Sequence, residues 1–323
     1  MAGGLAALMI LIGLAACAGA GSRSTSHGAD KGHPGRISTA PARRLPSPLY
    51  GVTLDDVTNI GQIVAGLRSL PEAPTARIYF DVREPAGYYT AAVNALRPVS
   101  YLMGELLDSS DETHIAAPAY NKRVRSYLAA FGNKVDLWEI GNEVNGNWTG
   151  RYPTVAAKLT DAYRDVATAG KRTALTLYYN AGCGDGPAEL SPAAFSRAYV
   201  PAAVRRGLDY VLLSYYPGEC RGIRPDAATW TAYFQRLHAL YPHALLGFGE
   251  IGMSEPVTAK TLGSAESLVR RYYGLPIGLP YYVGGSFWWY FAEDCLPYAR
   301  RPLWGAFRAG LRAEASRWEQ RQR

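Results

Sequence analysis

Two apolar segments of this sequence each end in a glutamate, and a pair of carboxylates placed in this way can cleave glycosidic bonds. Residues 135–143 read Val-Asp-Leu-Trp-Glu-Ile-Gly-Asn-Glu, and residues 244–250 read Ala-Leu-Leu-Gly-Phe-Gly-Glu. Barrel enzymes place their catalytic groups at the C-terminal ends of buried strands. In glycoside hydrolysis, one carboxyl group can attack the anomeric carbon while the other protonates the leaving oxygen. The two segments therefore predict catalytic carboxylates at Glu143 and Glu250.

These segments belong to a regular alternation of strand-like and helix-like patterns from residue 48 onward. We expect strands at residues 49–54, 76–82, 99–106, 135–143, 173–180, 210–216, 245–251 and 282–290. We expect helices at residues 57–69, 86–96, 118–131, 154–169, 192–206, 227–240, 260–274 and 303–320. Eight strand–helix units predict an α/β fold, a single (β/α)8 TIM barrel over residues 48–323. The competing doubly wound sheet usually has a Gly-rich phosphate loop after its first strand, and Gly51-Val52-Thr53 is not such a loop.

The N-terminal residues have the composition of a targeting segment followed by a linker. Residues 1–17 contain an apolar run too short to span a bilayer and end in Leu-Ala-Ala-Cys, which resembles a bacterial lipobox with Cys17 as the lipidated residue. No Lys or Arg precedes this run, so an ordinary signal peptide with an incidental Cys17 is the alternative. Residues 18–47 have almost no large apolar side chains, so we expect a disordered, flexible linker. This pattern predicts an exported protein, either a periplasmic or outer-membrane lipoprotein of a bacterium or a secreted one.

Charge and cysteine content narrow the expected partners. The formal net charge is +7, but residues 18–47 hold five basic side chains against one acidic, and no basic stripe interleaved with aromatics indicates nucleic-acid binding. We expect a monomer that contacts a membrane only through the possible lipid anchor. Cys183 and Cys220 follow neighbouring predicted strands and are the preferred disulfide pair, which leaves Cys295 free. No His accompanies the cysteines at ligand spacing, so we expect no metal and no cofactor.

The segment 138–143, Trp-Glu-Ile-Gly-Asn-Glu, resembles the strand-4 signature of glycoside hydrolase clan A, whose (β/α)8 barrels carry catalytic glutamates on strands 4 and 7. The resemblance implies that Glu143 is the general acid/base and Glu250 is the nucleophile. Glu255 is the nearest alternative to Glu250, but it lies in a loop beyond the strand. The resemblance also implies that Asn142 positions a sugar hydroxyl, with a turn-forming role as the alternative.

Further strand positions correspond to clan positions that contact substrate or nucleophile. Arg77 matches the strand-2 arginine that keeps the nucleophile ionised. Its alternative is an inward salt bridge to Glu139, which we expect to be a structural carboxylate. Asp81 ends the same strand and is expected either to bind a substrate hydroxyl or to cap a helix. Ser-Tyr-Tyr-Pro at 214–217 resembles the strand-6 motif of the clan's endo-β-1,4-galactanases, which favours Tyr216 over its neighbour at 215 as the donor to the nucleophile.

Aromatic residues near the predicted strand ends could line a sugar-binding cleft. The clan uses a strand-8 tryptophan as the floor of the cleaved-sugar subsite. Because neighbouring side chains on a strand point to opposite faces, one of Trp288 and Trp289 faces inward, and we favour Trp288. Trp148 is expected in the cleft, with an ordinary loop role as the alternative. We also expect three more residues that follow strand ends to line the cleft, with an ordinary loop role as the alternative: Tyr179, Glu293 and Asp294.

Together these features predict a retaining glycoside hydrolase that cleaves a β-linked polysaccharide or oligosaccharide by double displacement. The segment after Glu250 lacks the aromatic residue of a galactanase-like strand 7, so the clan is assigned without a family. The alternatives are a non-catalytic glycan-binding barrel and a transglycosylase on the same scaffold. A different barrel enzyme, such as an aldolase or a metal hydrolase, would need a strand-end Schiff-base lysine or a histidine cluster, and neither is visible.

Overall fold

The computed structural model describes residues 43–184 and 189–322, which all belong to the unit of the chain that spans Ile37–Arg323. The predicted signal segment at residues 1–17, the candidate lipidation site Cys17 and most of the predicted linker lie outside the described residues. Within the described ranges, no helix combines the length and the apolar character that crossing a bilayer requires.

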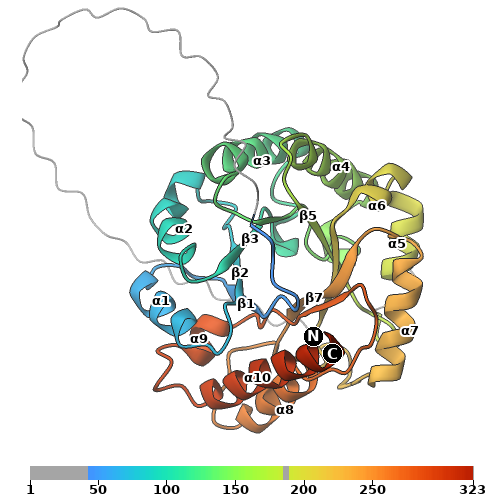
Figure 1. The fold of residues 1–323 in the computed structure, drawn as a ribbon. Helices are drawn as coiled ribbons and strands as arrows, with labels where there is room; N and C mark the ends of the chain where they lie inside the picture. The colour runs from blue at the N-terminus through green and yellow to red at the C-terminus, as the bar shows by residue number, and fades with distance from the viewer. Residues whose placement is uncertain (1–42, 185–188, 323) are drawn as a thin grey trace, which may run out of the picture. The chain divides into compact units, whose positions relative to one another are not determined.

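Eight parallel strands, hydrogen-bonded in sequence order, form the barrel (Figure 1). They are β1 (Gly51–Leu54), β2 (Thr75–Tyr79), β3 (Tyr101–Glu105), β4 (Leu137–Glu139), β5 (Thr173–Tyr178), β6 (Tyr210–Tyr215), β7 (Leu245–Ile251) and β8 (Tyr282–Gly285). Backbone bonds join the last strand region to the first: Leu49 N–H donates to the Val283 carbonyl, and Thr53 N–H donates to the Trp288 carbonyl, both at 3.0 Å. This arrangement confirms the predicted (β/α)8 TIM barrel.

Helices between the strands form the outer layer of the barrel (Figure 1). The α-helices are α1 (Ile60–Arg68), α2 (Thr90–Leu96), α3 (Ala117–Phe131), α4 (Tyr152–Thr168), α5 (Pro192–Tyr199), α6 (Ala202–Gly207), α7 (Ala227–His238), α8 (Leu262–Tyr272), α9 (Phe291–Cys295) and α10 (Leu303–Gln322). Short 3-10 helices are η1 (Ala86–Tyr89), η2 (Ser109–Asp111) and η3 (Asn147–Thr149). The expected single helix at 192–206 is two helices, because Pro201 holds the preceding Val200 in an extended conformation.

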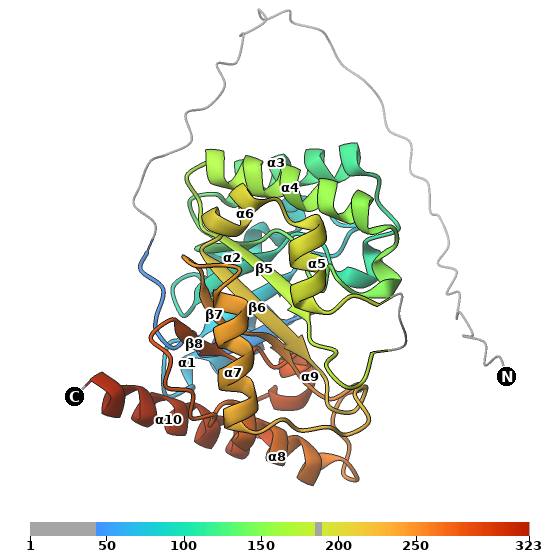
Figure 2. The ribbon, with the colours of Figure 1, turned by 90° about the vertical axis from the view of Figure 1, so that its right-hand side faces the viewer.

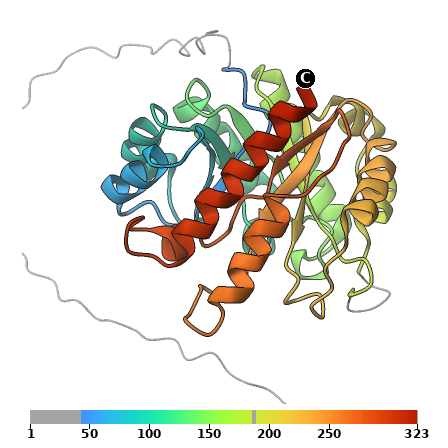
Figure 3. The ribbon, with the colours of Figure 1, turned by 60° about the horizontal axis from the view of Figure 1, so that its bottom comes forward.

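Apolar side chains fill the space between the strands and the helices. Figure 2 shows α7 lying across the outside of β6 and β7. From this helix, Trp230 and Phe234 contact Phe248 of β7 edge-on, with ring centroids 4.8 and 5.4 Å apart. Next to α7 around the barrel, α8 and α10 lie side by side (Figure 3). These contacts fix the strands, and through them the side chains at the strand ends.

The interior of the barrel changes from apolar to charged toward the C-terminal ends of the strands. A lower cluster contains Met103 of β3 and Leu137 of β4, which are register partners. Two residues further along the same strands, on the same face, are Glu105 and Glu139, also register partners. Carboxylates at this depth require partners. Arg77 of β2 supplies them, so a charged layer lies beneath the barrel mouth.

The chain contacts the barrel several residues before β1. Arg43 binds the carboxylate of Asp136, with Nε at 3.0 Å from Oδ1, and donates to the carbonyls of Arg97 and Ser100 at 3.0 Å. Leu45 is buried in the lower interior cluster. Within the described part of the chain, barrel contacts are therefore present from Arg43 onward, a few residues ahead of the predicted start at residue 48.

A disulfide links the loops that follow two neighbouring strands. Cys183 follows β5 and Cys220 follows β6, and the two residues form a disulfide with Cα atoms 5.0 Å apart. This is the pair preferred from the sequence. Cys295, in α9, is buried and is free within the described part of the chain. The disulfide ties together two loops at the barrel end that holds Glu143 and Glu250.

Candidate active site

Glu143 lies four residues beyond the end of β4, in an unusual backbone conformation. Its φ of 45° is in the left-handed region, which costs a residue other than glycine free energy and often occurs at functional sites. Two hydroxyl groups hold its buried carboxyl group. Ser109 Oγ donates to Oε2 at 2.8 Å, and Ser214 Oγ donates to Oε1. The turn of the backbone therefore aims Glu143 into a pocket whose donors are neutral.

Electrostatics around Glu143 favour its protonated form. The residue is 8% exposed, and burial raises the pKa of its carboxyl group well above the usual glutamate range. The neighbouring carboxylate of Glu250 raises this pKa further, while the hydroxyl donors lower it. Burial and the Glu250 carboxylate are the two largest effects, and both favour the protonated form. A proton on this group is what a general acid needs.

Glu250, within β7, has a different set of partners. Arg77 Nη1 lies 2.9 Å from Oε2, Asn142 Nδ2 donates to the same oxygen at 3.2 Å, and the hydroxyl of Tyr216 donates to Oε1 at 2.5 Å. Burial raises the pKa of Glu250, and the Arg77 guanidinium and the Tyr216 hydroxyl lower it. Three donors, one of them a cation, therefore stabilise the ionised form that a nucleophile requires.

Arg77 contacts three carboxylates from the interior of the barrel. Besides Glu250, its Nε lies 2.7 Å from Glu139 and its Nη2 lies 3.0 Å from Glu105. Both interactions considered from the sequence, the contact with the nucleophile and the inward salt bridge to Glu139, are present. Glu139 also accepts from the hydroxyl of Thr176, and the residue is buried below the mouth, consistent with a structural role.

Glu105 is a site residue that the sequence reasoning missed. It is fully buried at the end of β3, and burial raises its pKa well above the usual range although Arg77 opposes this. The signal was available, because Glu105 is a carboxylate at the C-terminal end of an apolar strand, as Glu143 and Glu250 are. Its protonation would leave Arg77 with fewer charged partners and a stronger net attraction for Glu250.

Two serines that hold Glu143 were also missed. Ser109 begins η2 after β3, and Ser214 lies on β6 as the register partner of Glu250. Ser214 could have been found, since it shares a strand face with Tyr216 by the two-residue period. Ser109 carried no such signal, because it lies outside any strand and reaches the site only through the fold of its loop.

The tryptophan that faces the active site is Trp289, so the preference for Trp288 was wrong. The Trp289 ring lies over the Arg77 guanidinium at 5.4 Å and meets Tyr79 edge-on at 6.3 Å. Trp288 is completely buried, and its indole N–H donates to Asp294 at 2.8 Å. The alternation failed because β8 ends at Gly285, and residues 284–286 all have positive φ, which breaks the two-residue period.

The two strand-6 tyrosines point in opposite directions, as the alternation predicts. Tyr216 reaches Glu250, as preferred from the sequence. Tyr215 points outward, where its hydroxyl donates to the carbonyl of Ile223. Tyr179 also packs outward against Trp230, with ring centroids 4.5 Å apart, so its expected place in the cleft was wrong. Asp294 accepts a hydrogen bond from the buried Trp288, so it too has a structural role.

Asp81 and Trp148 lie nearer the rim. The carboxylate of Asp81 accepts from the backbone N–H of Arg83 at 2.8 Å and from its guanidinium at 3.0 Å, so it closes a local turn. With Tyr79 and Asp111 it lines a cavity of about 540 Å³ beside β2. Trp148, in η3, is 41% exposed and meets Tyr178 edge-on at 5.0 Å. An exposed indole in η3, the short helix that follows Glu143 in the chain, offers a stacking surface for a sugar.

Comparisons with known proteins reveal likeness in fold alone. The sequence matches no protein-family model and no curated protein. The structure is similar to a GH10 xylanase from Bispora sp. MEY-1 with xylobiose, with a TM-score of 0.53 and 14% identity over 75% of this chain and 83% of that one. It is also similar to Fpglu1 from Fervidobacterium pennivoraus, with a TM-score of 0.50 and 11% identity over 72% of this chain and 74% of that one.

A further similar structure is a GH128 subgroup II endo-β-1,3-glucanase from Pseudomonas viridiflava, with a TM-score of 0.49 and 13% identity over 81% of this chain and 98% of that one. The xylanase is a glycoside hydrolase by its description. The chain therefore shares a barrel fold with a glycoside hydrolase, and its own side chains must indicate its chemistry.

Proposed function

We propose that this barrel is a retaining glycoside hydrolase that acts on a β-linked glycan, with Glu143 as general acid/base and Glu250 as nucleophile. The observation that carries the proposal is the difference between the partners of the two carboxyl groups. Glu250 binds a guanidinium, a phenol and an amide, whereas Glu143 binds two serine hydroxyls. Such a difference separates the pKa values of an acid and a nucleophile.

In the first step, Glu250 attacks the anomeric carbon while Glu143 gives its proton to the leaving oxygen. The glycosidic bond breaks as an ester bond forms between the sugar and Glu250. In the second step, Glu143, now ionised, takes a proton from water. The resulting oxygen nucleophile displaces Glu250 from the anomeric carbon, which returns both carboxyl groups to their starting states and retains the configuration.

Neighbouring residues position the groups for these steps. Asn142 bonds to both halves of the site, since its Nδ2 donates to Glu250 and its Oδ1 accepts from the Ser109 N–H at 3.1 Å. The same Ser109 holds Glu143 through its hydroxyl. In this arrangement Asn142 sets the relative orientation of the carboxyl groups in addition to any contact with a sugar hydroxyl. The face of Trp289 is available as a platform for the ring of the cleaved sugar.

The first test is a hydrolysis screen over β-linked glycans with the wild type, Glu143→Gln and Glu250→Gln. Glu255→Gln is the matched control, because this acid is exposed and lies a few residues from Glu250. We expect both active-site variants to lose at least about 1,000-fold in kcat/KM on unactivated substrates, and the control to keep its activity. Wild-type turnover in either active-site variant would remove the role assigned to that residue.

A second test separates retention from inversion. NMR of the initial product should show the β-configuration, and a slow 2-deoxy-2-fluoro glycoside should leave one sugar on Glu250 by peptide mass mapping. An adduct on another residue, or an α-configured first product, would overturn the double displacement. Products longer than the substrate at high glycan concentration would instead identify a transglycosylase that uses the same intermediate.

A further inference from the structure

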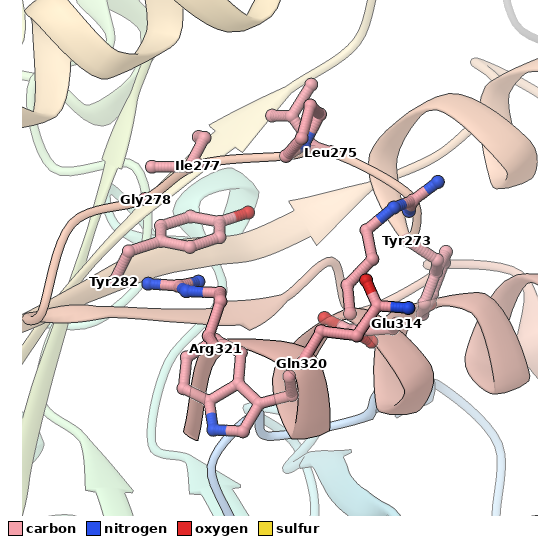
Figure 4. Close-up of a pocket in the computed structure, with 11 residues that line it drawn as sticks. Tyr273, Leu275, Ile277, Gly278, Tyr282, Glu314, Gln320 and Arg321 are labelled. Atoms are coloured by element: carbon pink, nitrogen blue, oxygen red, sulfur yellow. The ribbon is translucent and has the colours of Figure 1, made fainter. Parts of the chain in front are cut away.

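A second cavity, of about 410 Å³, has Tyr282, Glu314 and Arg321 among its lining residues (Figure 4), and it lies at the opposite end of the barrel from Glu143 and Glu250. It is formed by the loop that leads from α8 into β8 and by the C-terminal half of α10. Tyr282, the first residue of β8, lines it, so it lies at the N-terminal end of the strand, whereas the candidate catalytic groups follow C-terminal ends. Its volume is in the range of about 300–1,000 Å³ typical of small-molecule sites.

Aromatic and apolar side chains form the walls of this cavity. Tyr282 and Ile277 are almost completely buried, and Trp318 of α10 is partly buried. The guanidinium of Arg321 stacks over the Trp318 ring at 4.6 Å and is held by a hydrogen bond to the Leu279 carbonyl at 2.8 Å. The guanidinium covers one face of the ring and keeps the ring in place, so a sugar would pack against the part of Trp318 that lines the cavity. A rigid aromatic ring beside a cavity suits the apolar face of a pyranose.

A buried carboxyl group in the same cavity has an unsatisfied atom. Glu314 of α10 is 7% exposed, and its Oε2 has no hydrogen-bond partner in the described part of the chain. Leaving a polar atom buried and unpaired costs free energy, and such an atom calls for an explanation. Burial raises the pKa of Glu314 well above the usual range although the Arg317 guanidinium opposes this, so a neutral carboxyl group is favoured. Oε2 itself is closed off from solvent, so a ligand hydroxyl would meet the carboxyl group where Glu314 lines the cavity.

Positive charge borders the cavity. Arg317 is exposed and forms no ion pair or hydrogen bond with residues 43–184 or 189–322, and Arg321 carries a second guanidinium. With Glu314 neutral, the lining has a net positive charge. An anionic group on a ligand would find a partner at Arg317, because a guanidinium binds carboxylates through paired hydrogen bonds.

We propose that this cavity is a second carbohydrate site, distinct from the candidate active site, that binds a hexuronic acid unit. Such a sugar has an apolar ring face for Trp318, hydroxyls for Glu314 and a carboxylate for Arg317. The three complementary features are present in one molecule of suitable size. A site at this end of the barrel would anchor the protein on an acidic glycan without occupying the cleft.

The proposal is tested by measuring how D-glucuronate and D-galacturonate bind to the full chain. Calorimetry and protein-observed NMR both monitor this binding. We expect saturable binding with a Kd of about 1 mM, which corresponds to about −4.1 kcal/mol. Glucose lacks the carboxylate and acetate lacks the ring, so each should bind at least roughly 10-fold more weakly. Glu143→Gln should leave uronate binding unchanged, which separates this site from the cleft and from the proposed hydrolysis.

Variants of α10 identify the site. Arg317→Gln and Trp318→Ala should each weaken uronate binding roughly 10-fold or more. Arg312→Gln is the matched control, because Arg312 is exposed on the same helix and does not line the cavity. Arg317 is exposed, so its variant should fold as the wild type does even if Trp318→Ala does not. Absence of saturable binding, equal binding of glucose or acetate, or unchanged binding by Arg317→Gln would each overturn the proposal.

Discussion

Asn142 holds Glu250, with its side-chain nitrogen 3.2 Å from Oε2, although the two residues are 108 positions apart in the sequence. The residue that precedes the acid/base candidate in the chain therefore positions the nucleophile candidate. Because one strand end carries both Asn142 and Glu143, a shift of that strand end would move both carboxyl groups out of alignment.

Tyr216→Phe should lower kcat/KM and shift the acid limb of the pH–rate profile upward. The change removes a hydrogen bond that lowers the pKa of Glu250, so ionisation of the nucleophile would require a higher pH. A hydrogen bond to a charged group contributes about 1.5–3 kcal/mol, which corresponds to roughly 10- to 150-fold in rate. The matched control is Tyr215→Phe, whose hydroxyl binds a carbonyl outside the barrel. Equal losses in both variants would contradict the assignment.

Arg77→Met should destabilise the fold by about 3–5 kcal/mol, because it leaves several buried carboxyl groups without their cation. Urea unfolding monitored by tryptophan fluorescence measures this free energy. Arg83→Met is the control, since Arg83 forms an exposed pair with Asp81 and should change the free energy of unfolding by less than about 1 kcal/mol. A mild effect at Arg77 would mean that the charged layer is not needed for stability.

The pH dependence of kcat/KM should be bell-shaped, with the whole bell above the usual glutamate range. Glu250 must be ionised and Glu143 protonated, and burial raises the pKa of both. The acid limb reports mainly Glu250, because Arg77 and Tyr216 favour its ionisation, and the alkaline limb reports mainly Glu143. Glu143→Gln, assayed on an aryl glycoside that needs no proton donor, should lose the alkaline limb. A single-limbed wild-type profile would argue against this pair.

Glu143→Gln should also be more stable than the wild type at neutral and higher pH. A carboxyl group whose pKa is raised on folding binds its proton more tightly in the folded state, so its contribution to stability is lost as pH rises through the folded pKa. The difference in Tm between variant and wild type should therefore grow with pH and vanish below the usual glutamate range. Glu255→Gln, at an exposed position, should show no such trend. A difference independent of pH would refute the linkage.

Substitution of Trp288 should mainly lower stability, whereas substitution of Trp289 should mainly lower activity. Trp288→Ala empties a completely buried position and should cost about 3–5 kcal/mol in unfolding free energy. Trp289→Ala removes a partly buried ring beside Arg77, so we expect a smaller stability loss and at least roughly 10-fold lower kcat/KM. Thermal melts and steady-state kinetics on one glycan measure both. If Trp289→Ala kept full activity, the stacking role would be withdrawn.

The sequence was informative where a regular period governed the side chains. Glu143, Glu250 and Tyr216 follow from strand ends and alternation, and the barrel follows from the repeated strand–helix pattern. Alternation failed after Gly285, where positive φ values change the direction of the chain and Trp289 takes the inward position.

Contacts made by loops could not be predicted in the same way. Ser109 reaches Glu143 from a 3-10 turn, and Asn142 reaches Glu250 across the mouth. Both contacts depend on how loops of different strands fold over one another. No spacing in the sequence encodes such a meeting, because it is set by the tertiary packing of the barrel.

The left-handed backbone at Glu143 also bears on how this barrel can change. Glycine adopts this conformation without strain and asparagine tolerates it, whereas glutamate incurs a cost of about 1–3 kcal/mol. Replacement of the proposed catalytic acid by either residue would therefore relieve the backbone and remove a buried carboxyl group that is costly to ionise. For the backbone, the mutational step from the proposed enzyme to an inactive sugar-binding barrel is favourable. Only selection for turnover would keep the glutamate in place.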